Sequence, residues 1–309
     1  MIMRNLRDIF LYNDSQELNL ELDVALENIM DGNIGSAYYH INNLILEELN
    51  LLPKQTDVRE LYRFVGFPPL RRGKDISENE VIKDIREGRI TLGNPMKFND
   101  PMDPIIRVWI EKHCKNKTRD KNIQIMSRLI NLAMNSFRIC SLVREPSNSK
   151  FFHNTIDPFE NTLMWSHYAK SHTGLCIKYK ITPDVLNQHT DNNRILLLGD
   201  VRYRGQKELN DYISLDNSLL AKSQSWEYEH ETRLIFFTED RKDLKYRNGK
   251  IRNFVPLCGF DVETVYMGYR ISNEYKHAVK TAIIGTNIQL YQMSFEQHDI
   301  TKLVANQII

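Results

Sequence analysis

Apolar residues recur every three or four positions in the first fifty residues, the spacing that places them on one face of an α-helix. Residues 13–15 supply capping candidates before the first such stretch, and the turn sequence at 31–33 separates it from the second. The apolar positions are Leu18, Leu22, Ala25, Leu26 and Ile29, then Ala37, Ile41, Leu44, Ile45 and Leu49. The pattern predicts a helical hairpin in an N-terminal element, residues 1–56, packed on a main domain, residues 57–309. This element could also bind a protein partner or self-associate.

Beyond residue 57 the pattern changes to short runs rich in β-branched and aromatic residues, bounded by Gly, Pro, Asn and Asp. These runs predict strands at 60–67, 89–92, 137–143, 174–181, 195–204, 228–238, 254–258, 262–269 and 288–295. Helices are predicted at 77–87, where Ser77 and Glu80 suit a capping box, and within 105–137, 156–170 and 276–285.

Short strands mixed with helices favour an α+β fold over a repeating βαβ fold, because parallel sheets need a helical crossover after each strand. We expect a curved, mostly antiparallel sheet flanked by helices. The chain has neither G-x-G-x-x-G nor G-x-x-x-x-G-K-[ST], so a Rossmann dinucleotide fold and a P-loop are disfavoured.

Composition narrows the function only a little. The 41 basic and 40 acidic residues give a net charge of +1, which argues against a chain-wide basic surface and leaves local clusters open. No apolar run approaches the roughly 18 residues of a membrane span, and the first ten residues lack a signal-peptide core. We therefore expect a cytoplasmic protein without a membrane partner. Four scattered cysteines, with no C-x-x-C pair, predict free thiols and no zinc ribbon.

Three glutamates follow one another at every second position near the end of the main domain. In a strand, Glu227, Glu229 and Glu231 would share one face, with Arg233 next on it to pair with Glu231. Two interpretations stay open. The glutamates form a solvated strand face, or one carboxylate grips a ribose or stabilises a cationic sugar while a second activates an acceptor.

The stretch 163–179 holds the densest group of reactive side chains. On a helix Trp165, Tyr168 and Ala169 share a face and His167 pairs with Ser171 four residues on, while His172 precedes a turn at Gly174. The structural interpretation makes the two aromatic residues core and lets His172 cap the helix C-terminus. The functional interpretation places the histidines and Tyr168 in a cleft.

Two other chemistries find weaker support here. Ser166 and His167 are adjacent and no G-x-S-x-G elbow exists, which disfavours a Ser-His-Asp hydrolase. His167, His172 and Cys176 have spacings that could suit one helix, but Gly174 interrupts it, so no metal is predicted.

Arg63 and the turn at residues 97–104 complete the candidates. Arg63 lies mid-strand, where it is either an ordinary exposed arginine or a residue whose planar guanidinium binds a diphosphate or carboxylate. The turn residues Asn99 and Asp100 either end a strand or point toward a cleft.

Six segments in order resemble the bacterial family called domain of unknown function 2971, over about residues 60–270. They are LYRF, GRITLGNPMKFNDPMDP, RICSLV, MWSHYAKSHTGLCIKY, VRY and KSQSWEYEHETRLI. The combination of HYA-x-x-H-x-G-x-C-I with K-x-x-x-W-x-Y-E-x-E-x-R is the specific part.

More distantly, an aromatic-basic first strand followed by a late E-x-E strand resembles ADP-ribosyltransferases. The resemblance implies that NAD is the substrate and that ADP-ribose passes to a macromolecular acceptor, protein or nucleic acid, plausible in a toxin or in anti-phage defence. It implies that Arg63, or secondarily Tyr62, holds the NAD phosphates or ribose. The catalytic glutamate is then Glu231 or Glu229. The chain departs from the pattern in having no clear S-T-S motif.

The same resemblance implies that Tyr168 or Trp165 stacks on nicotinamide. The residues expected to line the cleft are His167 and His172, and those expected to shape its rim are Asn99 and Asp100.

Two alternatives remain beside the transferase. One is a nucleotide or nucleic-acid binding or sensor module without turnover, and the other is a hydrolase or nuclease that uses His167, His172 and the carboxylates. An enzyme requires Arg63, His167 and Glu231 to converge on one ligand, whereas purely structural roles would leave them scattered, each with a local partner. Their positions in the fold therefore distinguish an enzyme from a structural role for these residues.

Overall fold

The computed structural model describes residues 23–28, 31–70, 72–98, 100, 103, 131, 133–145, 157–205, 219–240, 244, 252–299 and 301–309. Its helices are α3 (Ile34–Leu51), α4 (Glu80–Arg86), α7 (Thr162–His167), α8 (Pro183–Gln188) and α12 (Asn273–Ala282), with 3₁₀ turns η1 (Ile76–Glu78), η2 (Pro95–Lys97), η3 (Pro158–Glu160) and η4 (Gln224–Glu229). Its strands are β1 (Arg59–Val65), β2 (Arg89–Gly93), β3 (Phe137–Arg144), β4 (Leu175–Ile181), β5 (Arg194–Asp200), β6 (Arg202–Arg204), β7 (Ala221–Ser223), β8 (Glu231–Thr238), β9 (Phe254–Cys258), β10 (Asp261–Met267), β11 (Gln289–Phe295) and β12 (Leu303–Gln307).

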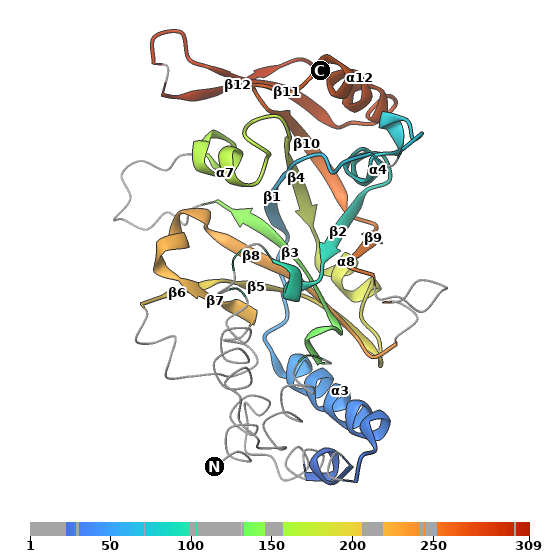
Figure 1. Cartoon of the computed structure of the whole chain (residues 1–309). Coiled ribbons are helices and arrows are strands. Elements are labelled where there is room, and N and C mark those ends of the chain that lie inside the picture. Colours follow the sequence, from blue (N-terminus) through green and yellow to red (C-terminus); the bar gives the residue numbers. More distant parts are fainter. Residues whose placement is uncertain are drawn as a thin grey trace.

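Ten of these strands form one large sheet in the order β12-β11-β10-β4-β1-β3-β2-β9, with β8 paired to β3 and β5 paired to β8 (Figure 1). Its pairs are antiparallel except β10 with β11, which α12 connects. Strands β6 and β7 form a separate parallel pair. The expectation of an α+β fold with a mostly antiparallel sheet is confirmed.

The sheet is covered differently on its two faces. The first face carries one continuous apolar cluster, into which Ile85 of α4, Val185 of α8 and Val279 of α12 pack. The opposite face, which we call the α7 face, carries two separate clusters. One packs Ile41 of α3 against β3, β5 and β8, and the other surrounds Trp165 of α7.

The second predicted helix of the N-terminal hairpin is confirmed as α3, and residues 23–28 are helical as well. The remainder of the first predicted helix lies outside the described residues. Because α3 contributes Ile41 and Ile45 to a cluster that includes Phe137 and Phe237, it shares its core with the main sheet. No helix within the described ranges is long and apolar enough to cross a membrane.

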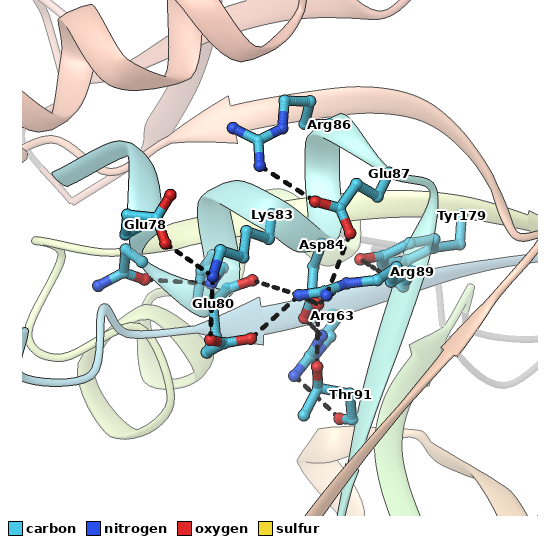
Figure 2. Close-up of polar contacts among 12 residues, drawn as sticks. Arg63, Glu78, Glu80, Lys83, Asp84, Arg86, Glu87, Arg89, Thr91 and Tyr179 are labelled. Carbon is cyan, nitrogen blue, oxygen red and sulfur yellow. Dashed lines mark hydrogen bonds and ion pairs between the residues drawn. The ribbon is translucent and has the colours of Figure 1, made fainter. Parts of the chain in front are cut away.

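One buried carboxylate joins α4 to strands β1 and β2 (Figure 2). Asp84, 1% exposed, accepts hydrogen bonds from Arg63 Nη1 at 2.9 Å, from Arg89 at 3.0 and 3.1 Å and from Thr91 Oγ1 at 2.9 Å. Arg63 Nη2 also donates to the Thr91 carbonyl at 3.1 Å. Arg63 is therefore not an exposed mid-strand arginine. Its guanidinium is occupied on the face of the sheet opposite α7.

The helix that carries Asp84 does not begin as the sequence suggested. The side chain of Asn79 caps α4 by accepting from Val81 N at 3.1 Å, while Asp75 caps the preceding turn η1. The predicted capping box of Ser77 and Glu80 is wrong, because an intervening 3₁₀ turn takes up Ser77.

We predict that Asp84→Ala lowers the free energy of unfolding by about 3–5 kcal/mol, because it leaves the guanidinium of Arg63 without its carboxylate and removes the buried one of the carboxylates that pair with Arg89. Glu78→Ala is the control. It removes exposed ion pairs with Lys74 and Lys83 and should leave the urea midpoint nearly unchanged. Equal losses in the two variants, measured by urea unfolding, would contradict the structural role of Asp84.

Candidate functional site

A polar gap separates the two apolar clusters of the α7 face. Strand alternation places Ser141 of β3 on this face between Ile139 and Val143, and Ser141 pairs across to Arg233 of β8. The next pair in the register is Val143 with Glu231. Ser141 is exposed although β3 has a neighbouring strand on each side. The sheet face is thus open to solvent between the clusters.

Five charged side chains meet beside this gap, and each is less than 9% exposed. Lys222 Nζ of β7 lies 2.5 Å from Glu229 Oε2 and 3.2 Å from Glu231 Oε2. Arg233 Nε binds Glu231 Oε1 at 2.8 Å, and its Nη2 binds Asp103 Oδ2 at 2.6 Å. The predicted pair of Glu231 with Arg233 is confirmed, and Lys222 links both glutamates.

The two glutamates converge because the chain is not extended before Glu231. Residues 224–229 form the 3₁₀ turn η4, His230 adopts the left-handed conformation (φ 45°, ψ 46°), and β8 begins only at Glu231. The expectation that Glu227, Glu229 and Glu231 share a strand face is therefore wrong. The interpretation as a solvated face is wrong too, since Glu229 and Glu231 are 3% and 2% exposed.

The pKa values of Glu229 and Glu231 are shifted in opposite directions. Burial alone would raise the pKa of Glu231, but the charges of Arg233 and Lys222 outweigh it and lower the pKa to about 2. Burial raises the pKa of Glu229, and the charge of Glu231 raises it further, against the pull of Lys222. Two neighbouring carboxylates with pKa values pushed apart can divide the ionised role and the proton-accepting role.

Tyr168, at the C-terminal end of α7, contacts the charged cluster. Its hydroxyl donates a hydrogen bond to Glu229 Oε1. Burial, together with the negative charge of Glu229, raises the pKa of Tyr168, so this phenol stays protonated and can hold Glu229 in place.

An aromatic rim lies outside Glu229 and consists of His167, Trp226 and Tyr228. The hydroxyl of Tyr228 lies 3.2 Å from Nδ1 of His167, and the His167 ring meets the other two rings edge-on at about 6 Å. His167 is exposed and the other two are half-buried. Asn161, which caps α7, also donates to the Tyr228 carbonyl at 3.2 Å and so fixes α7 against η4.

Trp165 and His172 lie elsewhere. Trp165 is fully buried, donates from Nε1 to the Phe159 carbonyl at 2.6 Å and meets Phe64 edge-on, as its structural interpretation required. His172 stacks on Trp165 at 6.0 Å and contacts the ring of Phe295. Helix α7 ends at His167, well before His172.

Three consecutive residues between α7 and β4 have left-handed backbones: Lys170, Ser171 and His172, with φ of 50°, 55° and 67°. Each costs about 1–2 kcal/mol in an L-residue, so the turn must be held from outside. The His172 carbonyl accepts from Arg270 N at 2.9 Å, and the Gly174 carbonyl accepts from Gly268 N at 2.9 Å. These bonds tie the turn to the segment after β10.

The remaining predicted residues occupy separate places. Tyr62 lies on the α7 face, paired to Val143, and its hydroxyl donates to Glu145 at 3.3 Å. Asp100 precedes the cluster and its carbonyl accepts from Asp103 N at 3.2 Å. Asn99 lies outside the described residues.

The expected convergence of Arg63, His167 and Glu231 is only partial. His167 and Glu231 lie on the α7 face on either side of Glu229: His167 contacts Tyr228, the residue before Glu229, and Glu231 shares Lys222 with Glu229. Arg63, in contrast, is bound to Asp84 on the opposite face of the sheet. Sequence reasoning missed Lys222 as the shared partner, although the spacing K-x-x-x-W-x-Y-E-x-E-x-R contains it. No group of three metal-ligating side chains occurs among the residues that the structure describes.

Residues 164–234 match the model of a family described as Protein of unknown function (DUF2971), which confirms the resemblance over α7 to β8. This segment includes Tyr168, Lys222 and both glutamates. No curated protein and no solved structure matches the chain. The likeness to ADP-ribosyltransferases therefore remains a hypothesis.

We predict that Gly174→Ala destabilises the fold by about 3 kcal/mol, since a Cβ there would lie 2.2 Å from the Val65 carbonyl oxygen. Gly35→Ala is the matched control, because nothing lies within 4 Å of a Cβ at this helical position. It should stabilise α3 slightly. Thermal and urea unfolding of both variants would check this, and similar midpoints would contradict the tight packing of the turn.

A pH-dependent prediction follows from Glu231. Its folded-state pKa of about 2 lies below the unfolded value of 4.5, so its contribution, about 3 kcal/mol, is complete above pH 5 and is lost as the pH falls toward 2. The destabilisation caused by Glu231→Gln should therefore be smaller at pH 3 than at pH 6 in urea unfolding. An effect independent of pH would contradict the lowered pKa.

Proposed function

We propose that this protein transfers ADP-ribose from NAD to a macromolecular acceptor, with the reaction centred on Glu229 and Glu231. One observation carries the proposal. Two buried carboxylates that share Lys222, with pKa values displaced in opposite directions, border an opening in the sheet face at Ser141.

The division between the two carboxylates fits the chemistry of this transfer. The bond between nicotinamide and C1′ of the ribose breaks, and nicotinamide leaves with the bonding electron pair. Ionised Glu231 stabilises the positive charge that develops on the ribose. The acceptor nucleophile bonds to C1′ and gives its proton to Glu229, whose raised pKa suits a general base. One proton is released for each ADP-ribose transferred.

The strand order supports one shared location for this reaction on the α7 face. Strands β1, β3 and β8 are neighbours, and the row Tyr62–Val143–Glu231 crosses all three on the α7 face. This favours Tyr62 over Arg63 as the first-strand contact to NAD, since Arg63 is held behind the sheet. The resemblance to ADP-ribosyltransferases, and a role as a toxin or in anti-phage defence, are parts of the same proposal.

A binding module without turnover is the second candidate. It is favoured by the occupation of both Glu231 oxygens, one by Arg233 and one by Lys222, which leaves the carboxylate well satisfied without a ligand.

We predict that purified protein releases nicotinamide from NAD when RNA, DNA and protein acceptors are present, and that Glu229→Gln slows the release at least about 100-fold. Tyr168→Phe should cause a smaller loss, because it removes only the hydroxyl that holds Glu229. Tyr179→Phe is the matched control, since this buried hydroxyl donates to the Arg89 carbonyl on the other face and should not affect the rate.

The outcomes separate the candidates. Wild-type activity that Glu229→Gln leaves intact would overturn the role of Glu229. No nicotinamide release with any acceptor would reject the transferase in favour of the binding module.

A further inference from the structure

We propose that the acceptor is a single-stranded nucleic acid, with bases stacked on the aromatic rim and phosphates bound along β6. This inference rests on the proposed function for its chemistry, but the surface that carries it is independent of NAD.

The aromatic rim keeps part of its ring surface exposed, although Tyr228 also packs against the apolar cluster around Trp165. His167 is exposed, Trp226 and Tyr228 are half-buried, and Leu163, one turn before His167 on α7, is 47% exposed. Lys222 Nζ lies 5.0 Å from the centre of the Trp226 ring and fixes it from the inner side. Exposed aromatic rings such as those of Trp226, Tyr228 and His167 stack on unpaired bases of any sequence.

A group of arginines continues from this rim. Strand β6 pairs in parallel with β7, which leads directly into η4 and Trp226, so Arg204 is paired to Ser223 just before that turn. Alternation places Arg202 and Arg204 on one side of β6 and Tyr203 on the other. The Tyr203 hydroxyl accepts from Glu231 N at 2.7 Å, so the two arginines lie on the side away from the buried carboxylates.

Two further arginines extend this basic group at the other end of β6. Asp200, the residue two positions before Arg202, lies 3.1 Å from Arg59 and 3.7 Å from Arg144. Both arginines keep 24% of their side chains exposed. Arg144 also donates to the Glu231 carbonyl at 2.6 Å. One member of the basic group, Arg144, therefore contacts the backbone of Glu231, the proposed catalytic residue. Figure 1 shows β6 and β7 beside β5 and β8, at the margin of the molecule.

This combination selects one class of acceptor. Arginines spaced along a strand bind successive phosphates, while aromatic faces need bases that are not already stacked in a duplex. Because the whole chain carries a net charge of only +1, attraction to phosphates must come from a local group of basic residues such as this one.

The test is fluorescence anisotropy with a labelled single-stranded 12-mer of DNA, the same 12-mer as RNA, and the DNA duplex, without NAD. We expect single strands to bind more tightly than the duplex and binding to weaken with salt. Trp226→Ala should weaken binding about 5- to 150-fold, the range for loss of one stacked base. Arg204→Ala should weaken binding and reduce its salt dependence.

Matched controls lie on other elements, the helices α3 and α4. Tyr39→Ala removes a 59% exposed ring from α3, and Arg86→Ala removes an exposed arginine from α4. Both should bind like the wild type. Urea midpoints establish that all variants are folded.

Absence of single-strand binding, tighter duplex binding, or equal effects of Trp226→Ala and Tyr39→Ala would each overturn the inference. Its failure is distinct from that of the proposed function. NAD turnover without nucleic-acid binding removes only this acceptor, whereas binding without turnover removes the transferase and leaves this surface intact.

Discussion

The shared ammonium group of Lys222 is the interaction on which the candidate site depends. Two carboxylates cannot both be buried and ionised so close together without a cation between them, because their mutual repulsion adds to the cost of desolvation. Lys222 lies on β7, and Glu229 and Glu231 lie on either side of a left-handed residue, His230. The ion pairs of Lys222 therefore require both the 3₁₀ turn η4, which positions Glu229, and the start of β8, which positions Glu231.

The sheet sets the rest of the geometry by alternation. On β1, Tyr62 and Arg63 are neighbours in sequence, yet one lies with the α7 cluster and the other is bound to Asp84 behind the sheet. The two faces have different roles. The Asp84 network holds α4 against the sheet, and the α7 face keeps an opening at Ser141, between its two apolar clusters.

The sequence predicted much of the fold but only part of the site. Periodicity correctly indicated α3, and the alternation at 174–181 matches β4. The pattern failed at 227–231, because alternating glutamates read as a strand although His230 reverses the backbone locally. It could not show that Arg63 pairs with Asp84, 21 residues away, nor that Lys222 joins the glutamates, because both facts depend on tertiary pairing.

The pairings that build this opening also bear on how the protein folds. Tyr62 pairs with Val143, and Val143 pairs with Glu231, so the site requires three strands that are widely separated along the chain. Such non-local contacts form slowly, because long loops must close before any pairing is rewarded. A nascent chain therefore lacks the site until β8 has been synthesised and has docked on β3. The candidate site is therefore assembled only when the central sheet is complete.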